Sequence, residues 1–211
     1  MFRRPPDAWL LYVLAHGAGA GMRHRFMEAI AETLAARGIA TLRYEFPYMA
    51  TGARRPDPPA LLQATVRAVV AEAVRLATDL PLVAGGKSFG GRMTSGAQAR
   101  EPLAGVRGLI FLGFPLHPSK QPGVSRAEHL GAVDIPMLFL QGTRDDLANL
   151  DLITGVCRDL GPVAALHVLE GANHAFEVLK RSGRTDEAVR EELAGTIEEW
   201  CRGVVAAPGT A

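Results

Sequence analysis

A glycine-rich turn near the middle of the chain has the residues of a catalytic nucleophile. Residues 85–91 read Gly-Gly-Lys-Ser-Phe-Gly-Gly; an apolar segment, 80–84, precedes them and a stretch of helical pattern, 92–100, follows. The pentapeptide 86–90 fits Gly-x-Ser-x-Gly, in which a tight strand-to-helix turn raises one serine hydroxyl above a sheet. Glycine is needed two residues before and after the serine because that turn crowds backbone against backbone. The pattern predicts Ser88 as the nucleophile of a serine hydrolase.

Two other interpretations of the turn compete with this one. The same residues resemble the end of a phosphate-binding loop, Gly-x-x-x-x-Gly-Lys-Ser/Thr. That loop requires glycine at position 81, where this chain has Pro81, and it requires loop where Leu82-Val83-Ala84 indicate a buried strand. The other alternative is a glycine-rich turn without chemistry, and only partner residues elsewhere in the chain can exclude it.

Such partner residues follow two later apolar segments. A serine hydroxyl needs a base to take its proton, and the base needs a third group to orient it. After segment 136–141 the chain reads Gly-Thr-Arg-Asp-Asp, and after segment 164–169 it reads Glu-Gly-Ala-Asn-His. Serine, acid and histidine in this order, each at a strand end, are typical of the α/β-hydrolase arrangement. We therefore predict Ser88, Asp145 and His174 as the catalytic residues.

The acid has more than one candidate in the sequence. An aspartate in a Gly-Thr-Arg-Asp turn is also a common helix N-cap, so Asp145 has a purely structural alternative. Asp146 is the neighbour that could exchange roles with it, whereas Glu170 is expected to be a loop residue. Among the histidines, His167 is expected inside a strand, and His24 and His129 on surface helices. His117 is expected on a loop, where it could line a pocket.

Small residues after the first apolar segment indicate where a developing oxyanion would be stabilised. Residues 16–21 read His-Gly-Ala-Gly-Ala-Gly, and such residues let the backbone approach a substrate carbonyl. We predict that the backbone N–H groups of Ala18 and Phe89 form the oxyanion hole, and that His16 holds the loop. A dinucleotide-binding loop is disfavoured because the Gly-x-Gly-x-x-Gly spacing and a ribose-binding acid are missing.

Short apolar runs alternate with segments of helical pattern along the chain, which predicts the elements that position these residues. Near-continuous apolar strands suit a sheet covered on both faces. We predict an α/β fold, a doubly wound and mainly parallel sheet of about six strands with helices on both faces. A single domain is expected over 1–203, followed by a disordered tail, 204–211. The expected strands are Leu10–Ala15, Ile39–Tyr44, Leu82–Gly86, Val106–Leu112, Pro136–Gln141 and Ala164–Leu169.

Composition excludes several classes of function. The 211 residues are 48% hydrophobic and 21% charged with a formal net charge of +1, so a nucleic-acid-binding surface is not expected. Cys157 and Cys201 form no metal-binding pattern, no cofactor is expected, and a reducing, cytoplasmic location is the simplest assumption. No window is apolar enough for a membrane span. The run from Trp9 to Ala15 is interpreted as a core strand rather than a secretion signal.

Several separated segments together resemble one family. They are Gly17–Gly21, Tyr44–Tyr48, Gly85–Arg92, Leu140–Asp145 and Asn173–Phe176. On these residues the chain is similar to the α/β-hydrolase superfamily and, more narrowly, to a compact family of predicted hydrolases related to dienelactone hydrolases. Its eukaryotic relatives include a testis-expressed protein and a scaffold subunit of a histone-acetyltransferase complex. The resemblance implies a minimal fold without a cap domain or the opening antiparallel hairpin, and it implies the same catalytic residues.

The expected function is hydrolysis of a small ester, with a thioester or an amide as alternatives, through an acyl-enzyme on Ser88. Dienelactone hydrolases use a cysteine nucleophile, so their substrate is not carried over. Short loops at 47–59 and 114–130 are expected to shape an open pocket for a small acyl substrate. The competing hypothesis is a binding or scaffold module that has the hydrolase fold and a disused site.

Overall fold

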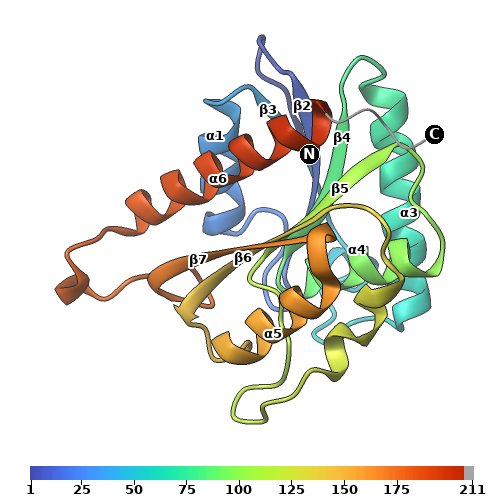
Figure 1. Ribbon diagram of the computed structural model, residues 1–211. Coiled ribbons are helices and arrows are strands. Elements are labelled where there is room, and N and C mark those ends of the chain that lie inside the picture. The colour runs from blue at the N-terminus through green and yellow to red at the C-terminus, as the bar shows by residue number, and fades with distance from the viewer. Residues whose placement is uncertain (207–211) are drawn as a thin grey trace.

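The computed structural model describes residues 1–206 and consists of one seven-stranded sheet with helices on both faces (Figure 1). Its strand order is β1-β3-β2-β4-β5-β6-β7, and every neighbouring pair is parallel except β1 and β3. The strands are β1 (Phe2–Arg3), β2 (Leu10–Ala15), β3 (Ile39–Tyr44), β4 (Leu82–Lys87), β5 (Val106–Leu112), β6 (Met137–Arg144) and β7 (Ala164–Asn173). The predicted doubly wound, mainly parallel fold is confirmed.

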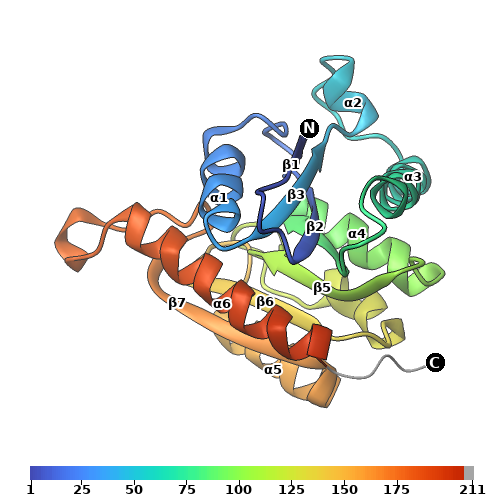
Figure 2. The ribbon, with the colours of Figure 1, turned by 90° about the horizontal axis from the view of Figure 1, so that it is seen from above.

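The helices divide into two layers that cover the two faces of the sheet (Figure 2). Buried residues of α1 and α6 belong to one core, and those of α3, α4 and α5 belong to the other. The helices are α1 (Arg25–Ala35), α2 (Pro47–Ala50), α3 (Pro59–Leu76), α4 (Phe89–Arg100), α5 (Leu150–Leu160) and α6 (Asp186–Ala206), with 3₁₀ turns at Ser125–Ala132, Gly161–Val163 and Lys180–Ser182. Strands buried on both faces are the reason that the apolar runs are nearly continuous.

The structure differs from the sequence expectations at the edges of elements. A short antiparallel strand, β1, pairs with β3, and apolar periodicity cannot detect a strand of two exposed residues. β6 and β7 extend beyond the expected Gln141 and Leu169 because backbone pairing continues through polar residues. Helix α6 runs to Ala206, so the predicted tail is helical over 204–206. Its remainder, 207–211, lies outside the described residues.

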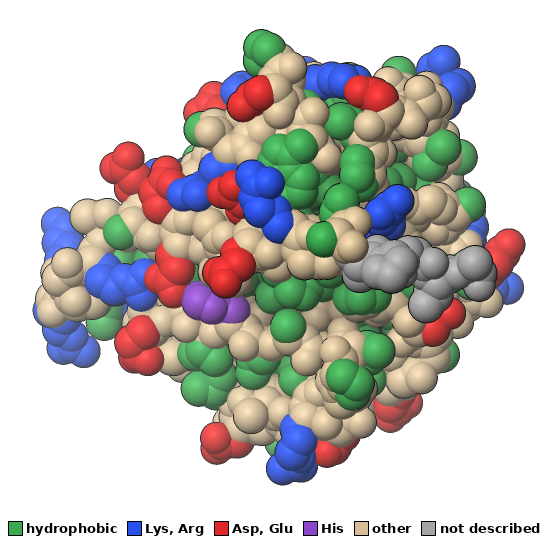
Figure 3. Space-filling model, turned by 45° about the horizontal axis from the view of Figure 1, so that its top comes forward, with side chains coloured by type: hydrophobic (Ala, Val, Ile, Leu, Met, Phe, Trp, Pro, Cys, Tyr) green, Lys and Arg blue, Asp and Glu red, His purple; other side chains and the backbone are tan. Residues whose placement is uncertain are grey.

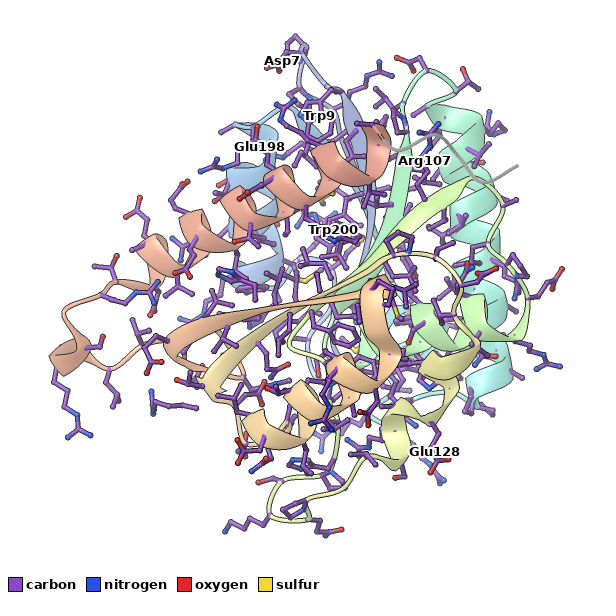
Figure 4. All side chains as sticks on the ribbon, in the orientation of Figure 1. Asp7, Trp9, Arg107, Glu128, Glu198 and Trp200 are labelled. Carbon is purple, nitrogen blue, oxygen red and sulfur yellow. The ribbon has the colours of Figure 1, made fainter. Side chains whose placement is uncertain are left out.

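The last helix packs on the sheet through the apolar stripe that the sequence indicates. Leu193 and Ile197 are fully buried, and Trp200 points from α6 toward the sheet (Figure 4). A Cβ at Gly108 of β5 would lie 2.7 Å from this indole ring, so glycine provides the space for the tryptophan. Glu198 of α6 binds Arg37 at 3.1 Å and ties this helix to the turn that follows α1.

On the face that Figure 3 shows, charged side chains of both signs are mixed. Acidic and basic residues alternate over the face that carries α6, and no basic surface forms there (Figure 3). This agrees with the near balance of 23 basic and 22 acidic side chains. Within residues 1–206, no helix combines the length and the apolar character that crossing a membrane would require.

Candidate active site

Ser88 lies in a strained turn between β4 and α4. Its backbone has φ 50° and ψ −117°, a left-handed conformation that residues other than glycine rarely adopt. The neighbouring positions leave no room for a side chain. A Cβ at Gly90 would lie 2.5 Å from the carbonyl oxygen of His16, and a Cβ at Gly86 would collide with the carbonyl oxygen of Ala15. The turn thus brings the first residues of α4 against the end of β2, and it leaves the serine side chain facing outward.

We expect Gly86→Ala to destabilise the fold by about 3 kcal/mol or more, because the Cβ meets backbone and φ is 154°. Gly155→Ala is the matched control. Gly155 lies inside α5 with only Arg158 within 4 Å of its Cβ position, so alanine should stabilise the protein by about 0.5 to 1 kcal/mol through helix propensity. Urea unfolding of the two variants measures both effects, and equal stabilities would contradict the prediction.

Three side chains form a hydrogen-bonded chain that starts at Ser88. The Ser88 hydroxyl lies 2.8 Å from Nε2 of His174, and Nδ1 of the same imidazole lies 2.7 Å from Oδ2 of Asp145. The three residues follow β4, β7 and β6, whose carboxyl ends meet at one edge of the sheet. Asp145 is almost completely buried, with its side chain 1% exposed, whereas His174 is 22% exposed and so remains open to a ligand.

The Asp145 carboxylate is fixed from several sides. Its Oδ2 also accepts a hydrogen bond from the Gln141 amide, and its Oδ1 accepts the Leu147 N–H at 2.8 Å. Asp146 points elsewhere, since its carboxylate accepts the Ser119 hydroxyl at the surface. Glu170 accepts a weak bond from Thr143 and makes no contact with the imidazole. Of Asp145, Asp146 and Glu170, it is therefore Asp145 that contacts the His174 imidazole.

The segment around His174 is held by its own turn. The Asn173 side-chain oxygen accepts the N–H groups of Ala175 and Glu177, each at 2.9 Å. Phe176 is buried at φ 63°, a strained conformation for an aromatic residue, and its ring stacks on Phe26 with centroids 5.6 Å apart. This packing holds the turn against α1 and restricts the position of the imidazole.

The loop after β2 borders the serine, as expected. A Cβ at Gly17 would lie 3.8 Å from that of Ser88. His16 is fully buried; its Nδ1 donates to the Gly17 carbonyl at 2.8 Å and its Nε2 accepts the Phe46 N–H at 3.0 Å. Burial lowers the pKa of His16, which favours this neutral form. The Tyr48 hydroxyl donates to the Ala18 carbonyl at 3.0 Å, so the loop is supported at two points.

A pocket of about 610 Å³ opens beside Ser88 and His174. Its walls come from the loop after β2, the first turns of α1 and α6, and the turn after His174. The apolar side chains that line the pocket include Phe26, Met27 and Phe176. Leu147, whose N–H binds Asp145, also lines it. The lining residues of α1 and α6 were not predicted, because the apolar periodicity of a helix indicates its buried face and not which residues border a pocket.

The loops 47–59 and 114–130 do not line this pocket, contrary to expectation. Tyr48 and Phe46 fill the space on that side and pack against Phe89. His117 is buried; its Nε2 accepts the Asn149 N–H at 2.9 Å and so holds the start of α5. The prediction that His117 could line a pocket is wrong for this cavity.

The remaining histidines have mainly structural contacts. His167 lies in β7, as expected, and its Nε2 is 2.8 Å from Glu192. His129 is partly buried and hydrogen-bonds Ser95 at 2.7 Å. His24 is the N-cap of α1 and lines the pocket, which its expected place on a surface helix did not indicate. Within the part of the chain that the structure describes, no cluster of three metal-ligating side chains occurs.

The two cysteines are buried and unreactive. Cys157 lies in the core beneath α5 and Cys201 in the core beneath α6, so the sheet separates them. Burial raises the pKa of each thiol to about 12. Both thiols therefore stay protonated near neutral pH, and a protonated thiol is a poor nucleophile.

The sheet order and the serine turn define an α/β-hydrolase, and residues 8–202 match the family described as an alpha/beta hydrolase domain. The chain therefore belongs to that family. Solved structures with the same fold include an alpha-beta serine hydrolase homologue from Coxiella burnetii, at 20% identity and a TM-score of 0.73, covering 93% of this chain and 90% of that one. The low identity shows a shared fold alone.

Two further structures extend the similarity. A dienelactone hydrolase from Anabaena variabilis is 20% identical with a TM-score of 0.72, covering 96% of this chain and 89% of that one. A protein from Xanthomonas campestris, described as an a/b serine hydrolase without lid, has the same identity and TM-score, covering 99% of this chain and 89% of that one. The expected resemblance to dienelactone hydrolases is thus supported at the level of the fold.

Proposed function

We propose that the protein is a serine hydrolase that cleaves small carboxylic esters through an acyl-enzyme on Ser88. The observation that carries this proposal is the chain of hydrogen bonds from Ser88 through His174 to Asp145 beside an open pocket. Family membership supports hydrolysis as the general class of reaction. Thioesters and amides are carbonyl substrates that the same residues could attack, and esters are favoured over amides because an alkoxide is a better leaving group than an amide nitrogen.

In the first half of the reaction, Ser88 Oγ attacks the ester carbonyl carbon while His174 Nε2 takes the hydroxyl proton. The carbonyl π electrons move to oxygen, and the N–H groups of Ala18 and Phe89 stabilise the oxyanion. The positive end of α4, which begins at Phe89, adds to this stabilisation. When the carbonyl re-forms, the ester C–O bond breaks and His174 gives its proton to the departing alcohol.

In the second half, water replaces the alcohol and attacks the acyl-enzyme. His174 accepts a proton from the water, a second oxyanion forms in the same place, and the bond from carbon to Ser88 Oγ breaks. The serine regains its proton from His174 and the carboxylic acid leaves. Throughout, the Asp145 carboxylate accepts the hydrogen bond of the His174 Nδ1–H group, so that Nε2 is free to act as the base.

The form of the pocket indicates the size of substrate. A volume of about 610 Å³ lies within the range of pockets for small ligands, and the wall carries Phe26, Met27 and Phe176. A short acyl chain fits against these side chains beside Ser88. A long chain extends past them into water and gains no further contact, so it binds no more tightly.

We therefore expect kcat/KM for p-nitrophenyl esters to rise up to butyrate or hexanoate and to gain nothing further out to palmitate. Initial rates across a series of acyl lengths, at concentrations below micelle formation, measure this preference. Rates that rise steadily toward palmitate would contradict the small-substrate proposal while leaving the serine chemistry intact.

A fluorophosphonate probe tests the serine chemistry without knowledge of the substrate. The probe should label Ser88 in the folded protein, as shown by peptide mass spectrometry, and His174→Ala should slow labelling because the serine loses its base. If the folded wild-type protein is neither labelled nor active on any ester, the binding or scaffold alternative replaces the enzyme proposal.

A further inference from the structure

Lys87 stands directly before the candidate nucleophile, and its side chain reaches the turn of the candidate base. It is the last residue of β4, and its Nζ donates to the backbone carbonyl of His174 at 2.6 Å. The same ammonium lies over the Phe176 ring, 5.1 Å from the centroid. One lysine therefore joins the serine turn to the turn that carries His174, although 87 residues separate the two in sequence.

The lysine ammonium, the imidazole and the carboxylate all lie close to Gly113, the residue after β5. A Cβ added to Gly113 would lie 3.3 Å from Lys87 Nζ, 3.5 Å from Asp145 Oδ2 and 3.5 Å from His174 Cε1. Gly113 has φ 70° and no side chain, so the three groups can approach one another there. Lys87 Nζ thus lies near the pair formed by Asp145 and His174, across the space that Gly113 leaves open.

The charge of Lys87 is sensitive to its surroundings. Burial lowers the pKa of Lys87 to about 8, and the Asp145 carboxylate opposes this effect. The lysine is accordingly protonated in most molecules at pH 7. Gly17 after β2 and Gly113 after β5 flank it without charge, and α4 begins with Phe89 and two glycines. The other ionisable residues of the pocket are His24 and Arg25 on α1, Glu177 after β7, and Asp186 and Arg190 on α6.

We propose that Lys87 is a positioning residue for His174: its hydrogen bond fixes the histidine backbone against the serine turn, and its positive charge favours ionised Asp145 and neutral imidazole. This inference rests on the proposed function. In a phosphate-binding loop, the lysine at this position of the motif would bind phosphate. Here Lys87 instead binds the turn that carries His174.

The sign of the electrostatic effect follows from Coulomb's law. A positive charge close to the imidazole disfavours the imidazolium form, so it lowers the pH at which His174 becomes neutral. Removal of the charge raises that pH. Because the free base is the active form, the acidic limb of kcat/KM should move to higher pH when Lys87 is neutralised.

Three substitutions separate the hydrogen bond from the charge. Lys87→Met removes both, Lys87→Gln keeps a donor without charge, and Lys87→Arg keeps the charge. We expect Lys87→Met to lower kcat about 10- to 100-fold with little change in KM, and to shift the acidic limb upward by about one pH unit. Lys87→Gln should recover part of kcat but keep the shifted limb, and Lys87→Arg should restore the wild-type limb.

Lys180→Met is the control, because Lys180 is an exposed lysine in a 3₁₀ turn away from the pocket lining. It should leave kcat and the pH profile unchanged. Thermal unfolding establishes that each variant is folded. The proposal is overturned if Lys87→Met keeps the wild-type kcat and acidic limb. It is also overturned if all three variants lose kcat equally with no shift of the limb, since that pattern indicates packing alone.

A measurement that needs no turnover distinguishes this inference from the proposed function. The His174 Cε1–H resonance, assigned with His174→Asn, can be titrated by NMR in the wild-type protein and in Lys87→Met. An upward shift of about one pH unit supports the role of the lysine even if no ester is cleaved. Identical titrations overturn that role, whether or not the protein proves to be an esterase.

Discussion

Replacing Ser88 with alanine is expected to lower kcat for p-nitrophenyl butyrate by roughly 10⁴-fold or more, because no other group can form the acyl-enzyme. The two cysteine thiols are buried, and burial raises their pKa values, so neither can substitute. Alanine keeps the Cβ that already fits the turn at φ 50°, so the fold should be retained. Activity that remains will come from the oxyanion donors and the pocket acting on water.

Initial rates of ester hydrolysis measure this effect. Loss of fluorophosphonate labelling gives an independent measurement, and thermal unfolding verifies that the variant is folded. Ser119→Ala is the matched control, since Ser119 is an exposed serine whose hydroxyl donates to Asp146. Its kcat should stay within about twofold of wild type, as is usual for surface substitutions. A Ser88→Ala variant that keeps more than a few per cent of activity would assign the nucleophile to another residue.

The second large effect is expected at the acid. Asp145→Asn should lower kcat about 10³- to 10⁴-fold, because an amide can present its NH₂ group to His174 Nδ1. The imidazole would then carry its proton on Nε2, where it can no longer accept the proton of Ser88. The Gln141 amide also donates to Oδ2 of Asp145, so in the variant two donor groups would face each other in a buried place.

Asp146→Asn is the comparison that distinguishes the two neighbouring acids. Its carboxylate is at the surface and accepts only the Ser119 hydroxyl, so kcat should change by less than about twofold. Measuring kcat for both variants at several pH values assigns the acid. Equal losses in the two variants, or a larger loss for Asp146→Asn, would contradict the geometry seen at His174.

The positions of the three candidate site residues could be predicted from the sequence, because each follows a predicted strand and the order of the strands constrains where they meet. The turn at Ser88 has a local pattern, and Asp145 and His174 follow strands whose carboxyl ends must meet at one edge. The structure brings these three side chains within hydrogen-bond reach of one another. The six core strands followed from apolar runs in the same way.

Features that depend on packing between distant segments could not be predicted. The sequence contains no signal that His117 turns away from the pocket to bind the start of α5, or that the first turns of α1 and α6 form its wall. The position of Lys87 Nζ likewise depends on Gly113 leaving room beside His174. Each is set by where two elements meet, which periodicity within one element does not determine.

The hydrogen-bonded chain of Ser88, His174 and Asp145 also makes the reactivity of the site a measure of folding. Its hydrogen bonds join residues 86 and 29 positions apart, and they form only after β4, β6 and β7 are aligned in one sheet. Such non-local pairing is slow in parallel sheets, because long loops must close before the contacts stabilise them. Recovery of probe labelling at Ser88 after dilution from denaturant should therefore follow the last cooperative step of folding, while helix signals in circular dichroism return earlier.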